Sequence, residues 1–146
     1  MPPITHRHLF GWKCETALKN TIEQLLEDTL VKTNNRFNTI DFLGNNWIVE
    51  LKSRPKLTER NTPQTSETFK EWLVPTCKTY KLGDYPDKDY VIFYYWEGDN
   101  SLWYIIYNKE EFDTFTCGVP FWSNQEHFWI PSDKFTKLDV QIPPIV

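Results

Sequence analysis

The stretch of this chain that decides its fold is Ile40-Asp41-Phe42-Leu43-Gly44-Asn45-Asn46-Trp47-Ile48-Val49-Glu50-Leu51-Lys52-Ser53-Arg54. Two apolar runs flank a short Gly-Asn-Asn segment, and both glycine and asparagine tolerate the positive φ angles of tight turns. The sequence therefore predicts a β-hairpin with strands over 37–43 and 47–53, and Pro55 ends the second strand.

The register of this hairpin decides which charged side chains meet. With Asn45-Asn46 as a two-residue loop, facing residues have numbers that sum to 91, so Asp41 lies directly across from Glu50. With Gly44-Asn45 as the loop, the sum is 89 and the two carboxylates are diagonal neighbours on one face. A three-residue loop without a bulge places them on opposite faces. Lys52 shares the face of Glu50, because alternate residues of a strand point the same way.

Two carboxylates and a lysine on one face suit a divalent cation. Mg²⁺ prefers carboxylate oxygens, and a bound ion can polarise a phosphoryl oxygen and lower the pKa of its water. Lys52 could orient the attacking water or stabilise charge in the transition state. The plain alternative is a solvent-exposed hairpin whose Asp, Glu and Lys form a weak ion pair. The apolar neighbours in both strands favour burial instead, and buried charges need partners or a metal.

A family resemblance rests on the same residues. The string Thr39-Ile40-Asp41, the turn, and then Val49-Glu50-Leu51-Lys52-Ser53-Arg54 resembles the core motif of the PD-(D/E)XK nucleases. It is most similar to the small single-domain members found in phages and large DNA viruses. Ile40 stands where the family name has a proline, and that position varies across the superfamily. The resemblance extends loosely from Gly11 to about Leu138.

The resemblance implies both a fold and an activity. The expected fold is α/β, with a restriction-endonuclease-like core whose central mixed sheet is flanked by helices, formed by residues 1–146 as one domain. The expected activity is Mg²⁺- or Mn²⁺-dependent hydrolysis of phosphodiester bonds, with DNA as substrate. A homodimer is a further expectation, since such enzymes often work as dimers. Whether the enzyme acts as endonuclease, exonuclease or resolvase depends on loops outside the motif.

The resemblance also assigns roles to residues. Asp41, Glu50 and Lys52 are expected to be catalytic, and a metal is expected on both carboxylates and the Leu51 carbonyl. Family members often add a Glu from the preceding helix, for which three residues compete: Glu15, Glu23 and Glu27. Glu15 is favoured, since it shares an inward stripe with apolar residues, although complementing the helix dipole explains it as well. The expected phosphate contacts, each with a solvated cation as the alternative, are Arg54, Lys78 and Lys81.

The remaining elements follow from apolar periodicity and turn signals. Residues 15–31 are expected to form a helix with one apolar stripe, followed much later by a loop over 55–68 and a short helix within 66–81, interrupted at Pro75. Residues 89–96 and 102–108 are expected to be aromatic strands, 127–130 a short strand, and Ser132 the cap of a final helical turn. The aromatic side chains favour a packed core over base stacking.

Charge and composition limit the function classes. The net charge of −4 hides an asymmetry: residues 36–81 carry eight Lys/Arg against five Asp/Glu, whereas 82–146 carry four against eleven. No apolar run approaches the roughly 18–20 residues of a membrane span, and the N-terminus lacks the apolar core of a signal peptide. We therefore expect a soluble intracellular protein without membrane partners. The resemblance to viral and phage members implies that it acts in a virus-infected cell.

Two rival functions remain at this stage. One is a non-catalytic nucleic-acid-binding or virion-associated protein with the same fold. The other is a protein-interaction domain that works through its acidic final third, from Leu82 onward.

Overall fold

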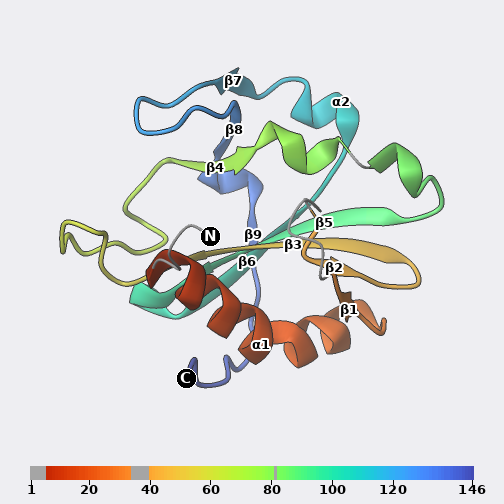
Figure 1. Cartoon of the computed structure of the whole chain (residues 1–146), viewed down its shortest axis with the longest axis horizontal. Helices are drawn as coiled ribbons and strands as arrows, with labels where there is room; N and C mark the ends of the chain where they lie inside the picture. The colour runs from red at the N-terminus through yellow and green to blue at the C-terminus, as the bar shows by residue number, and fades with distance from the viewer. Residues whose placement is uncertain (1–5, 34–39, 81) are drawn as a thin grey trace, which may run out of the picture.

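A six-stranded mixed sheet lies at the centre of the chain (Figure 1). The computed structural model describes residues 6–33, 40–80 and 82–146, with side chains from His8 onward. Strands β3 and β5 run parallel, and the other neighbours in this sheet are antiparallel. The strands are, in sheet order, β1 (Val31–Lys32), β2 (Phe42–Leu43), β3 (Trp47–Arg54), β5 (Asp89–Trp96), β6 (Ser101–Ile106) and β9 (Thr136–Lys137).

The two faces of this sheet are covered differently. Helix α1 (His6–Leu26) packs on one face, and a three-stranded antiparallel sheet lies over the other (Figure 1). The small sheet consists of β4 (Glu71–Pro75), β8 (His127–Pro131) and β7 (Thr116–Gly118). The remaining elements are short: η1 (Thr76–Thr79), η2 (Leu82–Asp84), η3 (Glu97–Asp99), α2 (Lys109–Phe112) and η4 (Ser132–Lys134). Within the described ranges, no helix is long and apolar enough to cross a membrane.

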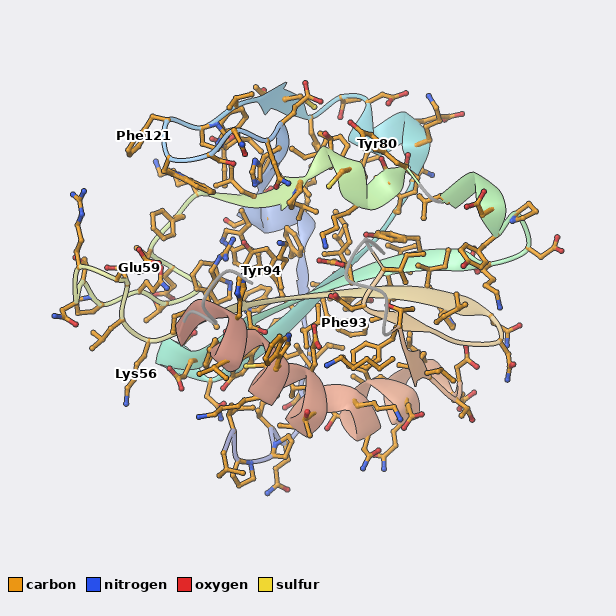
Figure 2. All side chains as sticks on the ribbon, viewed as in Figure 1. Lys56, Glu59, Tyr80, Phe93, Tyr94 and Phe121 are labelled. Atoms are coloured by element: carbon orange, nitrogen blue, oxygen red, sulfur yellow. The ribbon has the colours of Figure 1, made fainter. Side chains whose placement is uncertain are left out.

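The central strand β5 contributes to both cores. Its residues Tyr90 to Trp96 are all buried, because alternate side chains enter opposite layers. Phe93 packs in the layer of α1, whereas Tyr94 packs in the layer of the small sheet, and Figure 2 labels them on opposite sides of the ribbon. The prediction that these aromatic residues form core is thereby confirmed. Trp103 is half-buried and packs edge-on against Trp72 of β4.

The mixed α/β class and the central mixed sheet are confirmed. The expectation of flanking helices holds for one face only, because β4, β7 and β8 cover the other. Over its described residues, the segment predicted to contain a helix, 66–81, forms β4 and the 3-10 turn η1 instead. Trp72 and Val74 are buried at alternate positions, and so short an apolar run does not distinguish strand from helix in sequence.

Strand bounds near the hairpin and the C-terminus also differ from expectation. Within the first predicted strand, 37–43, only 42–43 are strand among the described residues, and 37–39 lie outside the described ranges. The second strand is confirmed and is one residue longer, ending at Arg54. The helical turn predicted at Ser132 is present, but Ser132 provides no side-chain cap, and the chain continues into β9.

Helix α1 extends from His6 to Leu26 rather than over the predicted 15–31. It ends because Glu27 adopts a left-handed backbone conformation, with φ of 51°, and the Asp28 N–H bonds back to the Glu23 carbonyl at 3.2 Å. This is the hydrogen bond of a Schellman motif. The early start also places Glu15 in the middle of the helix, where the helix-dipole explanation for it no longer applies.

The end of α1 positions Asp28 as a clamp on the hairpin turn. Its carboxylate accepts N–H groups from Asn45 and Asn46 at 3.0 and 2.9 Å, from Trp47 at 3.2 Å, and from Thr29 at 2.9 Å. Partial burial acts to raise the pKa of Asp28, but the four N–H donors outweigh it and lower that pKa. The turn therefore depends on a residue that lies seventeen positions before it in sequence.

Gly44 and Lys88 complete the clamp. A Cβ at position 44 would lie 2.3 Å from Asp28 Oδ2 and 2.9 Å from Leu30 Cδ2, so only glycine fits there without a shift. The Lys88 ammonium donates to the carbonyls of Gly44 and Asn45. Side chains from two other parts of the chain thus hold the turn of the hairpin.

We predict that Asp28→Asn lowers the free energy of unfolding by about 1–2 kcal/mol at neutral pH, because charge-assisted hydrogen bonds are lost. The folded pKa of Asp28 lies below the unfolded value of about 3.9, so its stabilisation is present above that pH and is lost as the pH falls through the folded value. Urea unfolding of both proteins from pH 7 to pH 3 measures this, and the difference should shrink on acidification. Glu27→Gln, at an exposed neighbouring carboxylate, is the control. A pH-independent difference would contradict the clamp.

Candidate metal centre

The hairpin has the register that brings the two carboxylates together. Strands β2 and β3 pair Phe42 with Val49 and Leu43 with Ile48, so facing numbers sum to 91. The prediction of an Asn45-Asn46 loop is confirmed, and the alternative with a three-residue loop is excluded. Asp41 directly precedes β2, and continuing the register places it opposite Glu50.

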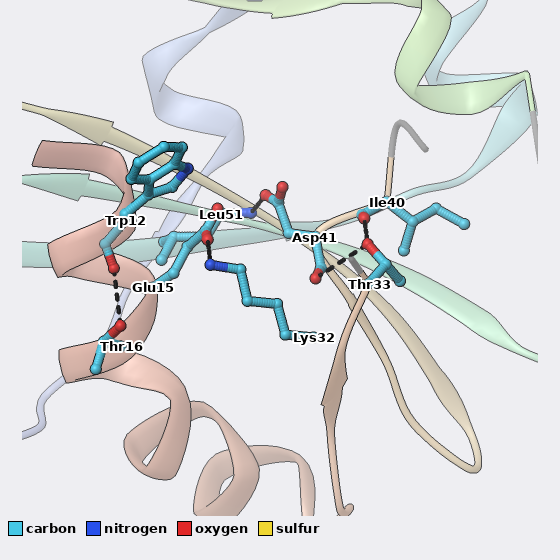
Figure 3. A network of polar contacts seen from close by, with 8 residues as sticks. All are labelled: Trp12, Glu15, Thr16, Lys32, Thr33, Ile40, Asp41 and Leu51. Atoms are coloured by element: carbon cyan, nitrogen blue, oxygen red, sulfur yellow. Dashed lines mark hydrogen bonds and ion pairs between the residues drawn. The ribbon is translucent and has the colours of Figure 1, made fainter. Parts of the chain in front are cut away.

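Asp41 lies at the point where β2 begins, beside a part of β3 that β2 does not pair with. Its Oδ2 accepts the Leu51 N–H at 2.8 Å (Figure 3), and its backbone carbonyl accepts the Thr33 N–H at 3.1 Å. The N–H and C=O of one strand residue point to the same side of the strand. The Leu51 carbonyl, a predicted metal ligand, therefore faces the Asp41 side of β3.

Glu50 is almost completely buried, with 2% of its surface exposed. Its Oε1 lies 3.2 Å from the ammonium of Lys78, which is on η1, directly after β4. Its Oε2 is buried and has no hydrogen-bond partner among the described residues. A buried carboxylate oxygen without a donor is costly, so the site has unused capacity to bind a cation or a hydrogen-bond donor.

The two carboxylates strongly influence one another. Burial, and then the charge of Glu50, raise the pKa of Asp41 to about 8, against the opposing effects of Lys78 and the Leu51 N–H. Burial lowers the pKa of Lys78, but the charges of Glu50 and Asp41 outweigh it and raise that pKa. Ionising both carboxylates would place more negative charge at the site than Lys78 neutralises, so Asp41 keeps its proton at neutral pH.

Lys52 lies on the same strand and face as Glu50. Burial lowers the pKa of Lys52 to about 8, with Glu50 and Asp41 opposing the shift and the nearby cations Arg54 and Lys78 adding to it. Lys52 forms no ion pair within the described part of the chain. It is a half-buried lysine whose catalytic role remains a prediction.

The predicted phosphate contacts have different positions. The guanidinium of Arg54 stacks over the Tyr94 ring at 5.5 Å from its centroid, at the end of β3. Lys78 is engaged with Glu50, and Lys81 lies outside the described residues. The roles of all three in binding phosphate remain predictions.

Glu15 is near the pair without joining it. Burial and the charge of Asp41 raise the pKa of Glu15, which an ion pair with Lys32 at 2.9 Å opposes (Figure 3). Of its rivals, Glu23 accepts the Leu30 N–H at 2.8 Å, and Glu27 is exposed. Glu15 is thus the helix carboxylate whose pKa Asp41 influences, and its role at the site remains a prediction.

The donor set fits a hard divalent cation of the Mg²⁺ type. No group of three or more His, Cys, Asp or Glu side chains that could hold a metal occurs in the described ranges. Mg²⁺, however, commonly binds through one or two carboxylates and keeps several waters. Asp41, the orphaned Glu50 Oε2 and the Leu51 carbonyl supply this kind of site.

Sequence reasoning missed one polar group near the carboxylates. The sequence predicts Tyr90 as part of the aromatic core, and its ring does pack there, but its hydroxyl is buried without a partner in the described structure. Burial, then Glu50 and Asp41, raise its pKa well above the usual value. Tyr90 pairs with Ile48 across the parallel strands, two positions before Glu50. No signal in the sequence reveals this pairing, because it joins distant segments.

Comparison with known proteins adds no relative. No protein-family model matches this chain, and neither does any curated protein or solved structure. The resemblance to PD-(D/E)XK nucleases therefore rests on the residues of the hairpin.

We predict that Asp41→Asn raises the free energy of unfolding by about 1–3 kcal/mol at pH 8 in the presence of a chelator. Between about pH 4 and pH 8 the folded wild-type chain keeps a proton on Asp41 that the unfolded chain releases, so wild-type stability falls as the pH rises through that window. Thermal unfolding at pH 5 and pH 8 measures the effect. Asp28→Asn is the same chemical change, but it is expected to lower the free energy of unfolding at pH 8. A destabilised Asp41→Asn protein at pH 8 would contradict the electrostatic description.

Proposed function

We propose that this protein is a Mg²⁺- or Mn²⁺-dependent nuclease that hydrolyses phosphodiester bonds, with DNA as its substrate. The observation that carries the proposal is the meeting of Asp41 with Glu50 in the hairpin register, beside Lys52 on the same face. A buried Glu50 beside the half-buried Asp41 is expensive to maintain, and Glu50 lies in a strand where an apolar residue would be more stable. Such a cost is typical of functional sites.

The chain's own residues have separable roles in this proposal. Asp41, Glu50 and the Leu51 carbonyl would hold the cation, which, when bound, would polarise the phosphate and lower the pKa of its water. Lys52, held on a rigid strand, would orient the attacking water and stabilise charge that develops on the phosphate. Glu15 would act on Asp41 from the helix side, through the charge coupling between them.

The substrate part of the proposal rests on resemblance and charge. Arg54, Lys78 and Lys81 belong to the basic stretch 36–81, and phosphate backbones bind to such cations. We extend the proposal to a restriction-endonuclease-like core and to a homodimer on the resemblance alone.

The test is cleavage of supercoiled, linear, single-stranded and branched DNA, with and without Mg²⁺ or Mn²⁺. The wild-type protein should cut at least one of them only with the metal. Asp41→Asn, Glu50→Gln and Lys52→Met should each reduce the rate by more than about a hundredfold, because each removes a group that acts in the transition state. Glu27→Gln should cut at the wild-type rate.

Three outcomes would count against this proposal. Metal-dependent cutting that persists in purified Asp41→Asn protein would refute the site. Salt-sensitive DNA binding without cleavage by the wild-type protein would favour the rival function, a non-catalytic nucleic-acid-binding protein. Capture of a protein partner that is indifferent to nucleic acid and chelator would favour the interaction domain.

A further inference from the structure

We infer that Lys78 and a divalent cation compete for the carboxylate of Glu50, so that the cation binds by ion exchange with a built-in ammonium group. The inference rests on the proposed function, since it concerns the cation of that site. The 3.2 Å contact between Lys78 Nζ and Glu50 Oε1 carries it. That contact uses an oxygen of one of the two carboxylates that would hold the metal.

A cation at Glu50 would lie close to the Lys78 ammonium. Glu50 is 2% exposed, Lys78 contacts its Oε1, and the unpartnered Oε2 that would take the cation belongs to the same carboxylate. Like charges at such a short separation in a poorly solvated site repel strongly. A doubly charged ion on Glu50 and Asp41 therefore disfavours an ammonium group at its present place.

The Lys78 ammonium can move away from Glu50 more easily than that of Lys52. Lys78 belongs to a short 3-10 turn, and 19% of its side chain is exposed, so its flexible stem has a path to solvent. Lys52 projects from the middle of β3, which β5 pairs along its whole length. The two lysines near Glu50 thus differ in freedom, and Lys78 is the one suited to exchange.

The position of Lys78 depends on the small sheet. Pro75, at the end of β4, pairs with His127, and the Thr76 N–H donates to the Glu126 carbonyl at 3.0 Å. These contacts fix the start of η1 two residues before Lys78. The small sheet therefore positions the Lys78 ammonium beside Glu50 of the large sheet. Exchange of Lys78 for a cation would change a contact between these two layers.

The first test measures Mn²⁺ binding to the whole chain from the loss of the free-ion signal in electron paramagnetic resonance. Lys78→Met should bind Mn²⁺ roughly tenfold more tightly than wild type, which corresponds to about 1.4 kcal/mol. Lys109→Met is the control. It removes an ammonium that lies 2.8 Å from Asp113 Oδ2 in an exposed ion pair, and it should leave the Mn²⁺ affinity unchanged. Unchanged or weaker binding by a folded Lys78→Met protein would overturn the inference.

The second test needs no variant and separates exchange from simple repulsion. Wild-type protein is acetylated briefly with an amine-reactive reagent, with and without Mg²⁺, and the labelled lysines are quantified by mass spectrometry. Labelling of Lys78 should rise severalfold with Mg²⁺, while that of Lys109 stays constant. If Mn²⁺ binds and DNA is cut but Lys78 labelling does not rise, the exchange is wrong and the nuclease proposal stands. If no divalent cation binds, both are wrong.

Discussion

The structure depends on how the turn of the β2–β3 hairpin is held. The Asp28 carboxylate binds three consecutive N–H groups of the turn, Gly44 leaves it the room to do so, and Lys88 binds two carbonyls. A slip by one residue would move every side chain of β3 to the opposite face. The apolar residues of β3 would then lose their layers, and Glu50 would enter the layer of α1. One constraint thus sets both the packing of the central sheet and the chemistry of its edge.

The same constraint brings two carboxylates together, and the surrounding residues offset the cost of this contact only in part. Asp41 and Glu50 meet in a poorly solvated place, where Lys78 neutralises one carboxylate oxygen and the Leu51 N–H bonds another. Glu50 Oε2 and the Tyr90 hydroxyl remain buried and unpartnered among the described residues. Proteins tolerate such costs at sites where a ligand relieves them, and stability is commonly traded for activity there. The stability and the proposed activity of this chain therefore make opposite demands on the same residues.

The meeting of Asp41 with Glu50 and Lys52 could be predicted from sequence because all three belong to one hairpin, where a turn signal and a period of two fix the geometry locally. The aromatic strands could also be predicted from sequence. The small sheet could not, because Trp72 and Val74 lie in an apolar run too short to show a period, and their partner strand is more than fifty residues away. The predicted end of α1, residue 31, is wrong because Glu27 adopts a left-handed backbone conformation, which a glutamate does not indicate in the sequence. The ion pair of Lys78 with Glu50 and the electrostatic influence of the carboxylates on Tyr90 likewise result from long-range pairing.

The central claim is that Asp41 and Glu50 together hold a divalent cation. Anomalous diffraction from crystals grown with Mn²⁺ tests it most directly, because the ion is located without reference to activity. The expected result is one strong peak within about 2.0–2.4 Å of a carboxylate oxygen from each residue, at the usual metal–oxygen distances. A crystal with the ion bound elsewhere, or with Asp41 and Glu50 unoccupied at saturating Mn²⁺, would contradict the claim.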